Sequence, residues 1–197
     1  MSKVAKQVKN VVKTAVKVNH GNFLETYIPA GMASAGPPLG PQLGQKNINI
    51  PAFCKEFNER TKDYIEGVPL PCRITVNSDR SFDLVINQPP SSFFLKQAAG
   101  IQRAAMNPYG EVAGKVTLKH IYEIAKIKQQ DASLSTESLE NICKQLIACA
   151  QTCGIKVVPK LDAKEYSQFL VERKEIVEEQ LRELQAKKEA RMLRTAS

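Results

Sequence analysis

The sequence has few residues that hold metals, and it has no long apolar run. It contains only two histidines, His20 and His120, and none of its five cysteines forms a C-x-x-C pair. We therefore expect no zinc site, no other metal and no cofactor. No stretch approaches the roughly 20 apolar residues of a membrane-spanning helix, so we expect no membrane association. An odd number of cysteines without a secretory signal indicates a reducing compartment.

Acidic residues are outnumbered by basic ones. The 197 residues include 28 Lys and Arg against 20 Asp and Glu, which gives a net charge of +8. This excess of positive charge favours a polyanionic partner. A soluble basic protein without such a partner is the alternative. Residues 1–24 hold five lysines and no acid, and residues 88–158 hold eight basic and five acidic residues. We expect these two segments to meet the anion first.

Residues 1–22 form a basic segment with two possible roles. Val4, Val8 and Val11 would share one helical face with lysines around it, as in the transit peptide of an organelle protein. The segment has no arginine and little serine, however, so a basic RNA-binding arm fits the residues nearly as well. Both interpretations stay open.

Residues 23–88 predict a small α+β domain. Residues 23–28 are typical of a short strand, and Asn49 can cap a helix that has a proline near its start. The buried face of this helix should hold Phe53, Cys54 and Phe57. Gly67, Pro69 and Pro71 should end the helical region. Two alternating runs, residues 72–77 and 82–87, then predict an antiparallel hairpin.

A stretch rich in proline and glycine, residues 35–44, lies within this domain. Prolines fix the backbone φ angle and glycines permit tight reversals, so we expect a stiff loop on the surface. A stiff loop loses little conformational entropy on docking, which suits recognition of a partner. A plain linker is the alternative, but linkers are seldom so apolar and so free of serine and charge.

Residues 89–158 predict an all-helical second domain, a bundle of three helices. The first should stop at Gly100, the second should be capped by Thr117, and the third should begin near Ser135 or Thr136. One apolar face of the third helix should form the core, with Leu139, Ile142, Cys143, Leu146, Ala150 and Cys153. Residues 155–158 should form a terminal strand after Gly154.

The opposite face of the third helix carries short, mostly polar side chains. They are Asn141, Gln145, Ala148 and Thr152, with Lys144 beside them. A flat stripe of this kind lets a helix lie against the wide, shallow minor groove of RNA and reach its 2′-hydroxyl groups. A protein partner would accept the same face. A helix-turn-helix protein would need side chains that reach DNA bases, which this stripe hardly offers, so we expect no DNA partner.

An enzyme is the remaining alternative. Asp79 and Asp83 could act as paired carboxylates, but they lie at a hairpin turn without a positioned base, nucleophile or phosphate loop. We therefore expect a non-catalytic protein.

Four motifs carry a resemblance to a known family. They are residues 28–33 (IPAGMA), 36–45 (GPPLGPQLGQ), 49–55 (NIPAFCK) and 95–101 (LKQAAGI). Over residues 24–158 the sequence resembles the large-subunit ribosomal protein eleven family, the protein of the ribosomal stalk base. The resemblance implies a structural ribosomal protein. Its helical second domain would bind the rRNA of the GTPase-associated centre, and its first domain would swing beside it.

The resemblance also implies which residues face the partners. Pro37, Pro38 and Pro41 would belong to a proline-rich helix that faces the same rRNA and, transiently, the translational GTPases. The family's RNA-facing positions on the third helix correspond to Ala148, Cys149 and Thr152. With the stripe, the predicted rRNA-binding residues are Gln97, Gly100, Gly114, Lys115, Asn141, Lys144, Gln145, Ala148, Cys149 and Thr152. Neighbouring ribosomal proteins of the stalk base are further expected partners.

The sequence departs from the family pattern at several positions. Ala35 replaces a common proline, Asn47 replaces a usual glycine, and Ala148 replaces the glycine of bacterial members. Because asparagine tolerates positive φ, the turn at Asn47 should survive. Ala148 adds a methyl group at the closest approach to RNA. The family's basic loop is here residues 106–114, which carry Glu111 and no basic residue, so its contribution to phosphate binding should be weaker.

Residues 159–197 predict a long C-terminal helix that starts at Asp162. One face is apolar, with Tyr166, Phe169, Leu170, Val177, Leu181 and Leu184. Such a face favours docking, for example on a neighbouring ribosomal protein, over a fully solvated helix. The segment resembles the C-terminal extension of animal mitochondrial members of the family. We therefore expect a ribosome-bound protein of the mitochondrial matrix, with a cytosolic or bacterial ribosome as the alternative.

Overall fold

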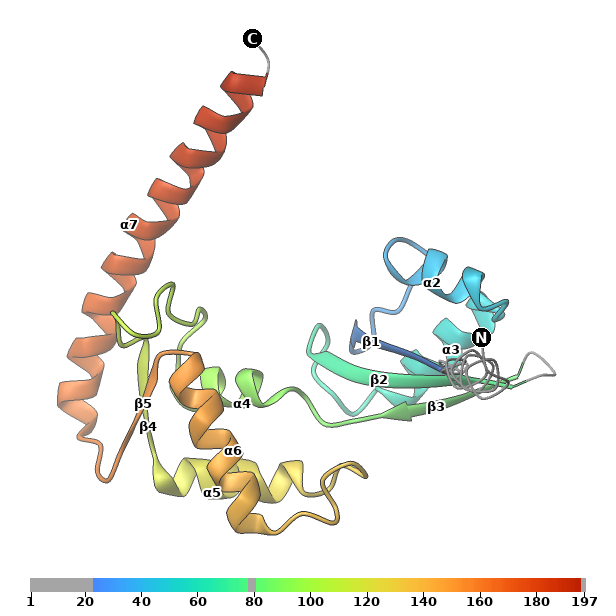
Figure 1. The fold of residues 1–197 in the computed structure, drawn as a ribbon, viewed down its shortest axis with the longest axis horizontal. Helices are drawn as coiled ribbons and strands as arrows, with labels where there is room; N and C mark the ends of the chain where they lie inside the picture. Colours follow the sequence, from blue (N-terminus) through green and yellow to red (C-terminus); the bar gives the residue numbers. More distant parts are fainter. Residues whose placement is uncertain (1–22, 78–80, 196–197) are drawn as a thin grey trace, which may run out of the picture. The chain divides into compact units, whose positions relative to one another are not determined.

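The computed structural model of the chain describes residues 23–77 and 81–195, so the predicted basic segment 1–22 lies outside the described residues. The chain divides between Ile86 and Asn87 into two compact units. Each unit has its own hydrophobic core. Helices and strands occur in both units (Figure 1), and the predicted α+β class is confirmed.

The first unit contains a three-stranded antiparallel sheet in the order β1-β2-β3. Its strands are β1 (Phe23–Pro29), β2 (Pro69–Val76) and β3 (Phe82–Ile86). Strand β2 begins three residues before the predicted run of residues 72–77, because Pro69 and Pro71 lie inside it. Their part of β2 pairs with β1 alone, since β3 pairs only with residues 72–76. It is therefore locally an edge, where a missing N–H group is tolerated.

One helix of this unit, α3 (Ile50–Arg60), packs on the sheet as its sequence predicts (Figure 1). The Asn49 side chain caps it by accepting a hydrogen bond of 3.4 Å from the Ala52 N–H. Phe53 and Phe57 are completely buried in one core with residues of β1 and β2. The 3.6-residue period of the apolar side chains therefore identified both the helix and its buried face.

The second unit is a helical bundle with a small sheet. Its three helices are α4 (Ser91–Ala98), α5 (Leu118–Lys128) and α6 (Leu139–Thr152). The prediction of an all-helical domain needs correction, because β4 (Gly114–Thr117) and β5 (Ile155–Val158) form a parallel pair. Residues 155–158 were predicted to be a strand. Strand β4 was not, because its four residues are too few to show the alternation of apolar and polar side chains that indicates a strand.

Helix α6 begins later than its sequence suggests. Ser138, rather than Ser135 or Thr136, caps it by accepting a hydrogen bond of 3.3 Å from the Asn141 N–H. All three residues suit a helix N-cap. Leu139 and Ile142, which follow Ser138, pack into the core of the second unit.

The C-terminal helix α7 (Ala163–Thr195) belongs to the second unit. Its first half packs on this unit through side chains that are half-buried or buried, namely Tyr166, Phe169, Leu170, Arg173 and Val177. Its second half extends beyond the other elements of this unit (Figure 1), and Leu181 is 51% exposed. The predicted docking face therefore rests in part on the chain's own domain. Among the described helices, none is long and apolar enough to span a membrane.

Candidate nucleic-acid interface

Helix α6 presents its polar stripe to the solvent. The exposed side chains are Asn141, Lys144, Gln145, Ala148 and Thr152, and Cys149 is half-buried at the border. Ile142, Leu146 and Ala150 on the other side are buried in the core. The predicted orientation of the helix is thus confirmed. An exposed alanine at the centre of the stripe leaves the surface flat, as close approach of a second molecule requires.

The polar groups of this face can still form hydrogen bonds and ion pairs with a partner. The Thr152 hydroxyl donates to the Cys149 carbonyl oxygen over 2.8 Å, so its lone pairs remain available to a hydroxyl donor. Lys144 pairs with Glu140 over 2.7 Å, and both side chains are more than two-thirds exposed. Because such exposed ion pairs contribute little stability, the ammonium group can exchange this carboxylate for a phosphate.

The two cysteines at the end of α6 have a packing role. Burial raises the pKa of the Cys149 thiol, and the nearby Cys153 raises it further. The thiol therefore stays protonated at neutral pH, a form that does not bind metals well. Among the described residues, no group of three potential ligands comes together. Cys149 and Cys153 instead pack against the core of the second unit.

The other predicted rRNA-binding residues of this unit do not form one exposed surface. Gln97 and Gly100 are exposed, but Gly114 is buried. A Cβ atom on Gly114 would lie 2.9 Å from the Ala99 Cβ atom, so this glycine permits close packing rather than contact with RNA. Lys115 is half-buried, and its Nζ atom lies 4.9 Å from the centre of the Phe169 ring on α7. Helix α7 thus contacts part of the predicted surface.

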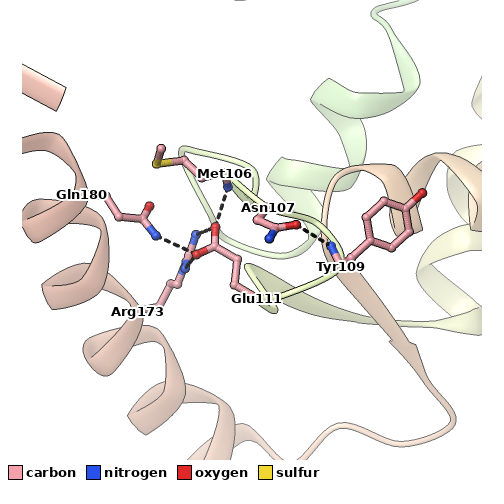
Figure 2. Close-up of polar contacts among 6 residues, drawn as sticks. All are labelled: Met106, Asn107, Tyr109, Glu111, Arg173 and Gln180. Carbon is pink, nitrogen blue, oxygen red and sulfur yellow. Dashed lines mark hydrogen bonds and ion pairs between the residues drawn. The ribbon is translucent and has the colours of Figure 1, made fainter. Parts of the chain in front are cut away.

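Glu111 binds α7 to the loop before β4. Its carboxylate accepts hydrogen bonds from Arg173 over 3.2 and 3.1 Å, from the Gln180 amide over 2.6 Å and from the Met106 N–H over 2.5 Å (Figure 2). The Arg173 side chain is only 6% exposed. From the sequence, Glu111 was noted only because it lies in a loop that has no basic residue. Its two partners on α7 lie 62 and 69 residues away, and no local sequence pattern pairs them with Glu111.

A second link joins α7 to both ends of the segment of residues 99–115, which contains this loop. The Tyr166 hydroxyl donates to the Ala99 carbonyl oxygen over 2.5 Å and accepts from the Lys115 N–H over 3.2 Å. The Tyr166 ring stacks on Phe169, with 5.8 Å between ring centres. One side chain therefore connects the residue after α4 with the start of β4.

The Glu111 contact should weaken in acid. The hydrogen bonds from Arg173 are the main cause that lowers the Glu111 pKa from 4.5 to about 2. A carboxyl group with a lowered folded-state pKa stabilises the fold fully above its ordinary pKa, and this stabilisation is lost as the pH falls toward the lowered value. We therefore expect Glu111→Gln to lower the free energy of unfolding by about 1–2 kcal/mol near neutral pH. This difference from the parent should shrink between pH 4.5 and about 2.

Urea unfolding of both proteins at a series of pH values checks this expectation. The parent's free energy of unfolding contains many titrating groups, but their contributions cancel in the difference between the two proteins. A difference that is constant over the whole range would show that the charge on Glu111 does not hold α7.

The proline-rich segment of the first unit is more ordered than the predicted loop. It contains a short helix, α2 (Leu39–Gln45), whose Leu39 and Leu43 side chains are buried. The three predicted partner-facing prolines, Pro37, Pro38 and Pro41, are all exposed. Asn47 adopts a φ of 57°, so the asparagine keeps the turn as expected. The segment therefore forms a rigid surface, which the buried side chains of Leu39 and Leu43 fix to the core of the first unit.

Only one of the two carboxylates considered for catalysis, Asp83, lies among the described residues. Asp83 is exposed, and one of its oxygens accepts a hydrogen bond of 3.2 Å from the Asn77 side chain. Asp79 lies outside the described residues.

These features define the class of protein. The chain is basic, and its helical unit offers a flat polar helix face of the kind that binds RNA. Residues 24–82 match the family model described as ribosomal protein L11, N-terminal domain, and residues 87–157 match ribosomal protein L11, RNA binding domain. The chain therefore belongs to the ribosomal protein L11 family.

Relatives differ in how much of the chain they cover. The large ribosomal subunit protein uL11m of Drosophila melanogaster is 61% identical over 195 residues, which are 99% of this chain and 100% of the relative. The uL11m protein of Caenorhabditis elegans is 53% identical and covers 98% of both chains. The uL11 protein of Bradyrhizobium sp. (strain ORS 278) is 43% identical over 135 residues, 68% of this chain and 94% of its own. These relatives are named as ribosomal subunit proteins and not as enzymes, which agrees with the prediction of a non-catalytic protein.

Proposed function

We propose that this chain is a structural constituent of the large subunit of the mitochondrial ribosome, in which α6 binds the rRNA of the GTPase-associated centre at the stalk base. The exposed stripe of α6 carries this proposal. Its side chains are short and polar, and it lies in the part of the chain that matches an RNA-binding domain. Such a face fits the shallow minor groove of RNA and its 2′-hydroxyl groups.

The first domain would face the same rRNA and, during translation, the translational GTPases. The exposed prolines of residues 37–41 support this role, because a rigid and anchored surface loses little entropy when a partner docks transiently. The expected stable partners are the rRNA and neighbouring ribosomal proteins. The mitochondrial location is supported by the relatives named uL11m, which match almost the whole chain.

A filter-binding comparison tests the proposal. The full chain is titrated with a structured rRNA fragment of the GTPase-associated centre, with a plain RNA duplex and with a DNA duplex, all with equal numbers of phosphates and at one salt concentration. We expect the rRNA fragment to bind at least about 100-fold more tightly than either duplex, since specific complexes exceed non-specific ones by such factors. Preferential binding of the DNA duplex would instead favour a helix-turn-helix function, and equal binding of all three nucleic acids would contradict the proposal.

A further inference from the structure

We propose that α7 is a working part of the rRNA-binding domain, in which Tyr166, Arg173 and Gln180 hold the segment of residues 99–115 in its binding shape. Helix α7 lies beyond residue 157, where the matched RNA-binding domain ends. The inference rests on the proposed function of α6, because the segment borders the C-terminal end of that helix.

Backbone hydrogen bonds place the segment beside α6. The Ala105 N–H donates to the Cys153 carbonyl oxygen over 3.0 Å, and the Ala113 N–H donates to the Gly154 carbonyl oxygen over 2.8 Å. Between the loop and the end of α6 lies a hollow of about 340 Å³, whose lining includes Tyr109 from the loop and Gln151 from α6. Thr152, the last residue of the stripe, directly precedes Cys153 and Gly154, which accept these two hydrogen bonds. A shift of the loop would therefore change the surface that meets RNA.

The loop has little core of its own to fix its shape. Met106 and Val112 are 49% and 41% exposed, and Tyr109 is completely exposed. Within the loop, the backbone carbonyl oxygen of Asn107 accepts hydrogen bonds from the N–H groups of residues 110 and 111. The side-chain oxygen of Asn107 accepts a hydrogen bond from the Tyr109 N–H (Figure 2). Because few apolar side chains are buried, the loop depends on hydrogen bonds for its order.

Helix α7 adds hydrogen bonds to the segment from one of its faces. Tyr166, Arg173 and Gln180 are spaced by seven residues, or nearly two helical turns, so their side chains project in almost the same direction. Tyr166 ties the two ends of the segment together, while Arg173 and Gln180 hold Glu111 near its middle. The guanidinium and carboxylate groups form two parallel hydrogen bonds, a geometry that fixes orientation as well as distance.

This arrangement should increase RNA affinity by preorganisation. Without α7, the segment would have to become ordered when RNA binds, and the lost conformational entropy would weaken the complex. Residues 106–114 include Glu111 and no basic residue, so the loop itself brings little attraction for phosphate. Its contribution would instead come from a fixed shape, which Glu111 secures through α7.

Arg173→Met in the full-length protein tests the inference. This change removes both hydrogen bonds to Glu111 and one positive charge. Arg182→Met, at an exposed arginine on the same helix, is the matched control for the charge. We expect Arg173→Met to weaken binding of the rRNA fragment about five- to ten-fold, and Arg182→Met to change it less than about two-fold. Amide hydrogen exchange should accelerate in residues 105–113 of Arg173→Met but stay unchanged in α5 and α6.

Two further variants, Tyr166→Phe and Ala148→Glu, separate failure of this inference from failure of the proposed function. Tyr166→Phe keeps the ring and removes only the hydroxyl between Ala99 and Lys115, so it tests the same segment if Arg173→Met proves unstable. Ala148→Glu reports on the α6 face alone. If Ala148→Glu weakens binding while Arg173→Met and Tyr166→Phe bind RNA like the parent, the inference is wrong and the proposed function stands. If Ala148→Glu also binds like the parent, the proposed function itself fails.

Discussion

Ala148→Glu is expected to weaken binding of the rRNA fragment about 100-fold, which corresponds to about 2.7 kcal/mol. Ala148 is exposed at the centre of the α6 stripe. A glutamate there adds a side chain that lifts the helix from the minor groove, and it brings a negative charge toward the phosphates. Thr152→Arg adds comparable bulk with the opposite charge, so its expected loss is smaller. The two variants together separate the steric effect from the electrostatic one.

The control for this prediction is Ala186→Glu, which places the same side chain at an exposed position in the second half of α7. Both substitutions lie in helices and on the surface, so their effects on thermal stability should be small and similar. Filter binding at one salt concentration gives the affinities. If Ala148→Glu and Ala186→Glu bind equally well, the rRNA lies on another face of the domain.

Gly154→Ala is expected to destabilise the second unit by about 3 kcal/mol. Gly154 has a φ of +70°, a conformation that disfavours any residue with a Cβ atom. A Cβ atom there would also lie 2.4 Å from the Ala105 Cβ atom and 3.2 Å from the Glu111 carbonyl oxygen. The substitution therefore combines backbone strain with a steric clash against the loop that borders α6.

Gly100→Ala is the matched control, because it shares the strain but not the clash. Its φ is +64°, and the nearest side-chain atom to an added Cβ would be the Leu170 Cδ1 atom at an ordinary 3.9 Å. We expect this variant to lose only about 1 kcal/mol. Urea unfolding of both variants gives the two free energies. Equal losses would mean that Ala105 and its loop move away without cost, and that the loop is not held against α6.

Helix faces and the N-terminal caps of α3 and α5 were accessible to sequence reasoning because they depend on neighbours within a few residues. The 3.6-residue period placed Phe53 and Phe57 of α3 in the core, and it separated the buried and exposed sides of α6. Thr117 caps α5 and Asn49 caps α3, as their side-chain chemistry predicts. Family membership followed from short motifs in a fixed order, which also need no tertiary information.

Several features of the candidate site depended on contacts between distant residues. The four residues of β4 become a strand because β5 lies beside them, and Gly114 is buried because Ala99 packs against it. Their local sequence is compatible with an exposed loop as well. For this reason the predicted rRNA surface included a glycine that the structure places in the interior.

The sequence by itself determined that the chain is basic and α+β, that one face of α6 is flat and polar, and that the last segment is a helix with an apolar face. Only the tertiary structure decided where that helix packs. Its apolar residues fit any apolar surface equally well, whereas the hydrogen bonds from Arg173 and Gln180 require one correctly placed carboxylate. The fold brings Glu111 to that position, so α7 rests on the chain's own RNA-binding domain.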